Sequence, residues 1–191
     1  NHVQRQLEEE GAEVVVPDLT DFMIYSFKNA KIKEHRYGTS KMGSFFAEIT
    51  IRYVESYRRT IREALADSVY DGPETVETLM AYAEEFVDLG NQYGEGWLLT
   101  AEMVELIRSG AGNIVCVQPF GCLPNHITGK GVIKSVREAY PTANIIPIDY
   151  DASASAVNQT NRIKLMMSQA EKNKFINNDL AKKHKTSAAG R

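Results

Sequence analysis

The chain has 191 residues, 43% of them hydrophobic and 25% charged, and a formal net charge of −3 at pH 7. This length is sufficient for one domain with a sizeable core, or for a domain with a smaller lobe. The balance of charge provides no basic surface for nucleic acid, and no apolar run reaches the roughly 18 residues that span a bilayer. The first residues lack a signal-peptide pattern, and two cysteines do not make a disulfide framework. We therefore expect a cytoplasmic protein with no nucleic-acid or membrane partner.

The N-terminal residues predict a helix and then a strand. Val3 and Leu7 lie four residues apart on one helical face, and Gly11 suits the end of that helix. A strand is expected over Glu13–Val16. Because Asn1 already leads into the helix, we expect the chain to be a fragment of a larger polypeptide.

Residues 18–43 alternate aromatic and basic side chains. They predict a helical or looped excursion whose aromatic residues pack inward; the alternative is a binding surface for a long anionic ligand. A helix is predicted from Ser44 to about Val69, with Arg58, Arg59 and Arg62 on a solvated face. Its buried stripe is expected to consist of Phe45, Ile49, Val54, Tyr57, Ile61 and Leu65.

Two more helices are expected before residue 110. The turn at residues 71–74 leads into the first, since Pro and Glu suit an initial helical turn. Its buried side should comprise Val76, Leu79, Met80, Ala83 and Val87. The second should run from about Leu98 to Ser109, with Thr100 as its N-cap.

The remainder of the chain alternates strands and helices. Strands are predicted at residues 113–118 and 144–148, and helices at 133–140 and 156–170. This order predicts parallel pairing, and the continuous apolar strands suit a sheet covered on both faces. The predicted fold is α/β: one domain over residues 1–172, with a core at about 111–172 and a helix-rich insertion or side lobe at about 18–110. The polar, basic residues 173–191 are expected to form a flexible tail.

The segment between the first strand and the next helix is the main candidate site. In open parallel sheets, ligands bind where strands end and helices begin. Pro119 and Pro124 stiffen this loop, while Gly121 allows close approach of the backbone. Cys122 lies just ahead of a predicted helix start, where the helix dipole favours a thiolate. A thiolate is the ligand that a soft metal or an iron–sulfur cluster requires, although a small packing residue is the alternative for Cys122.

Other polar residues of this loop have weaker patterns. Cys116 lies inside the strand, which favours a packing role over metal ligation. His126 is expected to form hydrogen bonds within the loop, with metal ligation or proton transfer as the alternative. Lys130, between Gly129 and Gly131, suits an anion at a helix start, but no Walker A pattern is present.

Two further segments are candidates for lining the same edge. Residues 94–97 (Gly-Glu-Gly-Trp) form a flexible turn with a carboxylate and the only tryptophan. Asp149 and Asp151 follow the second strand, where they could hold Mg²⁺ or share a proton. The alternative is that this segment, with Ser153 or Ser155, caps the next helix.

These segments together resemble a known family. The residues are Gly94-Glu95-Gly96-Trp97, the run from Val115 to His126, Asp149-Tyr150-Asp151 and the run from Asn158 to Met166. The set resembles the C-terminal part of the large activase-related proteins of the 2-hydroxyglutaryl-CoA dehydratase (2-hydroxyacyl-CoA dehydratase) family, over roughly Gly94 to Ser168.

The resemblance implies a fold of flavodoxin-like units, a parallel sheet flanked by helices, and ATP-driven, low-potential electron transfer. By resemblance, Cys122 ligates an iron–sulfur cluster and Cys116 is a second candidate, while Gly121, Pro124, Asn125, His126 and Lys130 line the cofactor site. ATP is expected to bind elsewhere in the full-length protein. Expected partners are the rest of the polypeptide or an activator or dehydratase subunit, and an acyl-CoA.

A cubane cluster normally takes four cysteine thiolates, whereas this chain has two cysteines. The isolated chain is therefore expected to be catalytically inactive. Two other functions remain open: a non-catalytic docking or scaffold module, and a CoA- or nucleotide-binding α/β domain that uses Lys130.

Overall fold

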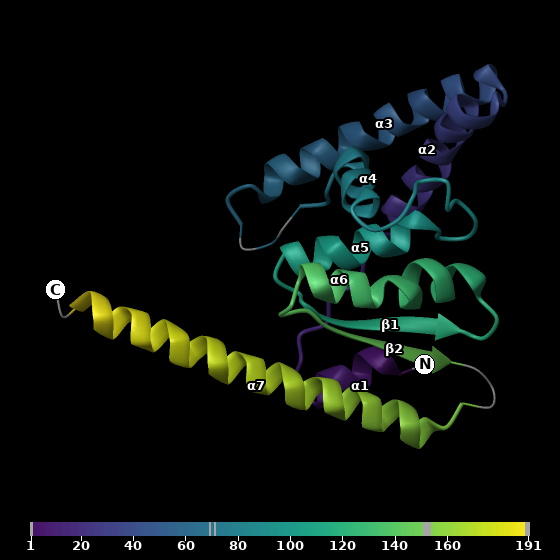
Figure 1. Ribbon diagram of the computed structural model, residues 1–191. Helices are drawn as coiled ribbons and strands as arrows, with labels where there is room; N and C mark the ends of the chain where they lie inside the picture. The colour runs from purple at the N-terminus through teal and green to yellow at the C-terminus, as the bar shows by residue number, and fades with distance from the viewer. Residues whose placement is uncertain (1, 69, 71, 151–153, 190–191) are drawn as a thin grey trace.

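The computed structural model describes residues 2–68, 70, 72–150 and 154–189, with side chains through Lys174 (Figure 1). In chain order the elements are α1 (Val3–Glu9), α2 (Leu19–Tyr37), α3 (Lys41–Leu65), α4 (Val76–Glu84), α5 (Trp97–Arg108), β1 (Asn113–Pro119), the π-helical turn η1 (Asn125–Gly129), the 3₁₀ turn η2 (Lys130–Val132), α6 (Ile133–Ala139), β2 (Asn144–Tyr150) and α7 (Ala156–Ala189). The α/β prediction is confirmed: the described residues are mostly helical, with a small parallel sheet.

The sheet is covered by helices on both faces, as Figure 1 shows. β1 pairs with β2 from Asn113 opposite Asn144 to Pro119 opposite Tyr150. One face of the sheet packs on α5 and α6 through a cluster that includes Ile114, Ile145 and Val136. The other face packs on α1 and α7 through a cluster made of Leu7, Ile148, Ile163 and Met166. We call β1, β2, α1, α6, α7 and the turns η1 and η2 the sheet unit.

Side chains cap two carbonyls on the outer edge of β2, and a proline occupies a third position there. The Asn144 amide donates to the carbonyl of Gly112, the residue before β1, at 2.8 Å. The backbone polar groups of the next residue, Ile145, and of every second residue after it therefore point away from β1. The Ile145 carbonyl accepts from Arg137, Pro147 has no N–H, and the Asp149 carbonyl accepts from Gln159 Nε2 at 2.9 Å. Side-chain caps and an edge proline are how proteins protect a terminal strand.

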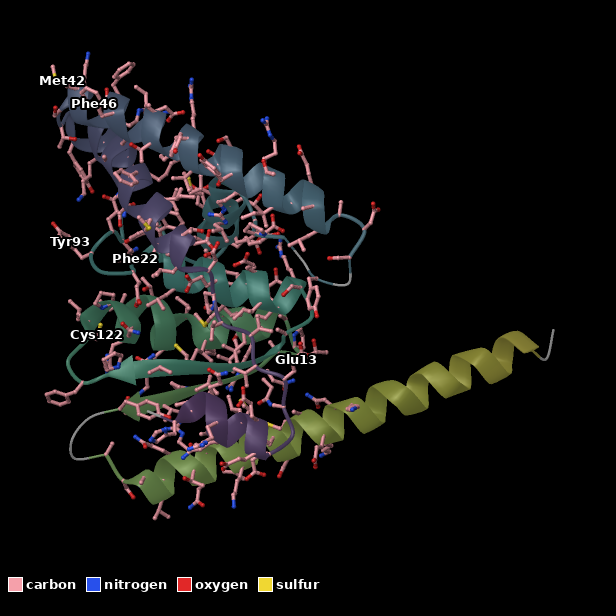
Figure 2. All side chains as sticks on the ribbon, turned by 180° about the vertical axis from the view of Figure 1, so that it is seen from behind. Glu13, Phe22, Met42, Phe46, Tyr93 and Cys122 are labelled. Atoms are coloured by element: carbon pink, nitrogen blue, oxygen red, sulfur yellow. The ribbon has the colours of Figure 1, made fainter. Side chains whose placement is uncertain are left out.

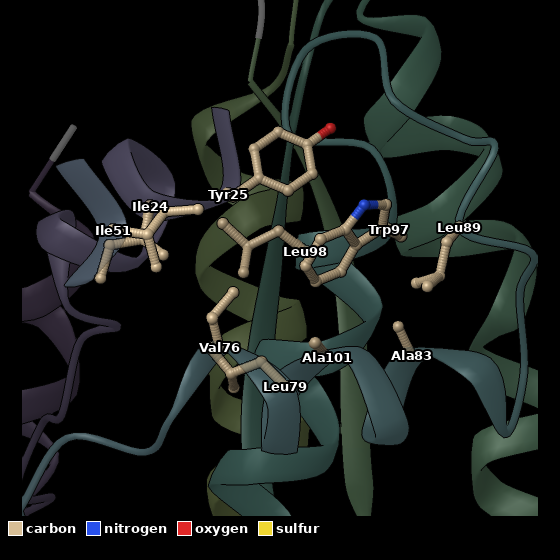
Figure 3. Close-up of a cluster of buried hydrophobic side chains, with 10 residues drawn as sticks. All are labelled: Ile24, Tyr25, Ile51, Val76, Leu79, Ala83, Leu89, Trp97, Leu98 and Ala101. Carbon is tan, nitrogen blue, oxygen red and sulfur yellow. The ribbon is translucent and has the colours of Figure 1, made fainter. Parts of the chain in front are cut away.

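Helices α2 to α5 form a second unit, which we call the helical lobe. α2 and α3 make a hairpin, and α4 and α5 pack beneath it (Figure 1). The fully buried Trp97 stands in the middle of the core of the lobe, 4.9 Å from the ring of Tyr25, and donates to Asn29 Oδ1 at 3.0 Å (Figure 3). The remaining core residues are Ile24, Ile51, Val76, Leu79, Ala83, Leu89, Leu98 and Ala101.

The predicted buried stripe of α3 is wrong at four positions, Phe45, Ile49, Tyr57 and Ile61, which are exposed. Val54 packs against the core of the lobe as predicted, and Leu65 is partly buried. The buried residues of the helix are Ser44, Ala47, Ile51 and Arg58. The buried face of α3 therefore carries two small side chains, an isoleucine and an arginine, while its aromatic side chains face outward.

The predicted solvated face is also wrong at Arg58. This guanidinium is 3% exposed, lies 2.5 Å from Asp21 of α2, and donates to the Glu74 carbonyl at 2.6 Å. Arg62 is partly covered and bonds to Glu55 and to the Pro73 carbonyl, and Arg59 alone of the three is largely exposed. A buried charge is retained only with such partners, so Arg58 fixes α3 to α2 and to the segment before α4.

Several smaller expectations are corrected. Residues 13–16 are extended but make no ladder with the sheet. The loop expected up to Gly131 becomes helical from Leu123 onward. α5 begins after Gly96, and Thr100 instead donates to the Thr128 carbonyl at 2.7 Å, joining the two units. Within residues 18–43, Tyr25 packs inward as expected, but Tyr37 is exposed.

Other expectations hold. Val76, Leu79 and Ala83 form the buried side of α4, with Met80 and Val87 packed beside them. α7 continues through Ala189, and the flexibility expected for residues 173–191 stays a prediction. In the described part of the chain, no helix is both long enough and apolar enough to cross a bilayer.

Candidate functional site at the carboxyl end of β1

Cys122 lies just beyond the carboxyl end of β1, where the sequence predicts it (Figure 2). Gly121 takes a left-handed φ of +67°, which turns the chain sharply after the strand. The Cys122 amide then bonds to the Pro119 carbonyl at 3.1 Å, and the half-buried thiol donates to Asn125 Oδ1 at 2.7 Å. The side chain therefore lies at the edge of the sheet rather than deep in the apolar core.

Asn125 fixes the thiol relative to the strand. Its side chain is buried, and its amide nitrogen donates to the Val117 carbonyl at 3.0 Å. That carbonyl points away from β2, so Asn125 also covers part of the outer edge of β1. One side chain therefore links the sulfur of Cys122 to the backbone of the sheet.

The turn η1 packs closely on β1. A Cβ at Gly129 would lie 3.1 Å from Cys116 Sγ and 3.3 Å from Gln118 Nε2, so a larger residue would push the turn away from the strand. Thr128 supports the same turn, because its hydroxyl donates to the Pro124 carbonyl at 2.9 Å. A π-helical turn is rare and is frequently found at functional sites.

Cys116 occupies a different environment. It lies in the sheet with 7% exposure and accepts a hydrogen bond from Gln118 Nε2 at 3.0 Å. Burial raises the pKa of this thiol, which disfavours the thiolate form. The side-chain oxygen Oε1 of Gln118 is buried without a hydrogen-bond partner among the described residues. The packing role that the sequence favours for Cys116 agrees with this position.

His126 and Lys130 are both exposed on the helical turn after Cys122. His126 Nδ1 lies 2.8 Å from the Cys122 carbonyl, which is the local hydrogen-bonding role expected from the sequence. Lys130 points instead into a groove between α6, β2 and α7, on a different side of the helical segment.

The Gly94-Glu95-Gly96-Trp97 turn meets the cysteine loop. A Cβ at Gly94 would lie 2.9 Å from Pro124 Cγ, so the two segments are in direct contact. Gly96 has a φ of +46°, and a Cβ there would lie 2.1 Å from the Asn91 carbonyl oxygen, so the position accepts only glycine. The expectation that these segments line one edge is thus borne out for Gly94, and Glu95 is exposed beside it.

Four apolar side chains of the cysteine loop, of η1 and of the turn that contacts Pro124 are at least half exposed. They are Phe120, Leu123, Ile127 and Tyr93. Figure 2 shows Tyr93 on the same side of the molecule as Cys122. Exposed apolar residues grouped around a polar centre mark binding surfaces more often than scattered ones do.

The groove that contains Lys130 is basic. It has a volume of about 570 Å³, and the cations Lys130, Lys134, Arg137 and Arg162 outnumber the single carboxylate, Glu138. The sequence analysis names only Lys130 of these. The others are separated in sequence, and only the packing of α7 against β2 brings Arg162 to α6.

The second acidic segment is only partly described. Asp149 uses its carbonyl to accept from Gln159, and the Ser155 hydroxyl accepts from the Asn158 amide at 3.4 Å at the start of α7. This supports the capping role for Ser155. Asp151 and Ser153 lie outside the described residues.

A group of carboxylates in the helical lobe was missed by the sequence analysis. Burial, with the nearby charges of Asp21 and Glu95, raises the pKa of Glu102 to about 8. Burial and the charge of Asp21 likewise raise the pKa of Glu105 to about 7. Both residues lie on α5 and read in the sequence as the polar face of an amphipathic helix, so no local pattern marks them.

The described side chains do not bring three or more His, Cys, Asp or Glu residues together as a metal-binding group. A scan against protein-family models and searches of curated proteins and of solved structures found no match for this chain. The family resemblance therefore stays a prediction.

Proposed function

We propose that this chain is the cluster-bearing domain of an ATP-dependent redox protein of the 2-hydroxyacyl-CoA dehydratase/activator type, and that Cys122 contributes one thiolate ligand. The proposal includes a cytoplasmic location, low-potential electron transfer and a flavodoxin-like sheet.

The observation that carries the proposal is the position of the Cys122 thiol. It is partly accessible and follows the carboxyl end of a parallel strand. In the thiol form its S–H donates to Asn125 Oδ1, and ligation of iron would replace this hydrogen bond, because a thiolate has no proton to donate. The apolar residues around it would exclude water from a bound group or a docked partner.

The residues of this chain fit one cluster ligand and not a complete set. A four-iron cluster takes four thiolates, and Cys116 is enclosed in the sheet under Gly129. The other ligands would come from the rest of the polypeptide or from a partner subunit. The part of this chain is to position Cys122 and to shield it.

The direct test compares two cysteine variants in the full-length protein, purified anaerobically. Cys122→Ala should lose iron, sulfide and the visible absorbance of the cluster. Cys116→Ala should keep the iron content, although it should lower stability because it leaves a small cavity. Unchanged iron in Cys122→Ala would refute the assignment.

The isolated chain offers a second test. Reconstitution with iron and sulfide should yield no stable four-iron cluster, because at most one accessible thiol is present. A stoichiometric, stable four-iron cluster on this chain alone would show that the proposed ligand set is wrong.

The basic groove favours one alternative function, the binding of CoA or another phosphate-bearing ligand. Its four cations lie around an open space of about 570 Å³, which is large enough for a phosphorylated group. A titration with CoA should then show saturable binding that Lys130→Ala weakens. Glu138→Gln is the matched control, because it removes the opposing charge and should strengthen the same binding.

A further inference from the structure

The exposed face of α3 carries an apolar stripe that no described residue covers. Its six side chains are between 48% and 71% exposed and recur every three or four residues. They are Met42, Phe45, Phe46, Ile49, Tyr53 and Tyr57. We call this set the α3 stripe; Figure 2 shows two of its members, Met42 and Phe46, at the end of the α2–α3 hairpin.

The stripe lies nearly opposite the buried face of α3. Ile51 is buried, whereas Ile49, two positions earlier and therefore on the other side of the helix, is half exposed. Its aromatic residues are already arranged in pairs: the rings of Phe45 and Phe46 lie 5.8 Å apart, and those of Tyr53 and Tyr57 lie 5.2 Å apart. Packing inside the chain does not require these side chains, because α3 is anchored through its other face.

We infer that the α3 stripe is a homodimer interface, in which α3 of a second copy packs antiparallel on it. With roughly 200 Å² for each large side chain, the exposed fractions correspond to about 700 Å². A standard interface buries about 800 Å² on each partner, and an uncovered patch on a monomer seldom exceeds about 600 Å². Phe, Tyr and Met are also the residues enriched in interface centres.

The charges along the stripe favour a second copy over a lipid surface. The flank carries Glu48, Arg52, Arg59 and Glu63, two of each sign. A helix that binds anionic lipid carries mainly Lys and Arg on its polar side. The balanced flank therefore disfavours an anionic lipid surface, and in an antiparallel pair it offers one contact between opposite charges, Glu48 with Arg59.

In the proposed dimer, the two-fold axis passes beside Tyr53 and thereby defines how the two α3 helices align. It sets Ile49 of one copy beside Tyr57 of the other, and Glu48 of one copy beside Arg59 of the other. The two copies thus use the same patch, as a closed two-fold dimer requires. This inference is independent of the cluster assignment, since the stripe contains none of the residues around Cys122.

Sedimentation velocity on the 191-residue chain, from about 1 to 100 μM, tests the inference. We expect a concentration-dependent dimer that Phe46→Glu and Ile49→Glu each weaken at least about thirtyfold. Leu165→Glu, at a 72% exposed position on α7, is the matched control and should leave the dimer unchanged. Because the substituted side chains are exposed, circular dichroism should show all three variants folded.

A monomer at the highest concentration would overturn the inference, as would a dimer that Phe46→Glu does not weaken. A chain that stays monomeric but sediments with phosphatidylserine vesicles would assign the stripe to a lipid surface instead. The register has its own readout. In a Cys122→Ser background, Tyr53→Cys should form a disulfide-linked dimer on oxidation, and Glu63→Cys should not. A dimer in which Tyr53→Cys fails to cross-link would exclude the antiparallel register.

Discussion

The sheet unit and the helical lobe both have regular hydrophobic patterns in their sequence. The pattern indicates which residues are buried in the strands, but it does not do so in α3. In the sheet unit, each strand is apolar on both faces, and helices cover both faces, so the pattern leaves little choice of orientation. In the lobe, one side of α3 exposes large apolar residues, and the buried side carries Ser44, Ala47, Ile51 and Arg58. Strand burial therefore follows from composition, while the orientation of α3 depends on its partners.

The first way to test this contrast is to remove the buried ion pair that orients α3. Arg58→Ala leaves Asp21 buried without its cation, so we expect a loss of about 3–5 kcal/mol of unfolding free energy. Arg59→Ala, one residue later but largely exposed, should change it by less than about 0.5 kcal/mol. Urea denaturation followed by circular dichroism measures both. Equal effects of the two variants would mean that the ion pair does not orient α3.

A backbone change tests the turn that joins the two units. Gly96→Ala places a methyl group 2.1 Å from the Asn91 carbonyl oxygen at a left-handed φ, and should cost about 2–4 kcal/mol. Gly110→Ala is a suitable control. It also has a positive φ but lies in open space, and it should cost only about 1 kcal/mol. If the two glycines prove equally tolerant in thermal unfolding, the turn does not constrain Trp97 and the cysteine loop as described.

The smallest expected effect depends on pH. The pKa of Glu102 is about 8 in the folded chain, against 4.5 for an ordinary glutamate, so the folded chain holds a proton that the unfolded chain has released between these values. Stability should therefore fall as pH rises from about 4.5 to 8. Glu102→Gln removes this loss and should stabilise the chain by about 2 kcal/mol at pH 8, discounted for partial exposure, and by almost nothing at pH 4.

The exposed Glu138 supplies the control for this pH dependence. Glu138→Gln, at a position whose side chain is 68% exposed, removes one carboxylate from the surface and should stabilise the chain less at pH 8 than Glu102→Gln does. A Glu102→Gln variant with the pH profile of the unchanged chain would show that the lobe holds no protonated carboxylate at that position.

The candidate site was partly readable from sequence. The position of Cys122 after a strand, and the turn that Gly121 makes, follow from local pattern and turn chemistry. The sequence did not reveal the hydrogen bond from Cys122 to Asn125, the contact of Gly94 with Pro124 or the arrival of Arg162 in the basic groove. Each of these joins segments whose distance depends on packing and not on spacing along the chain.

The sequence by itself determined where most helices and both strands lie, and that the strands pair in parallel, because hydrophobic period and turn residues act over a few neighbours. Tertiary structure alone decided which face of α3 is buried, that Arg58 is enclosed, and that Glu102 keeps its proton. These outcomes depend on what lies across from each side chain. Desolvation and ion pairing depend on neighbours that are distant in sequence, so the local hydrophobic periodicity does not predict them.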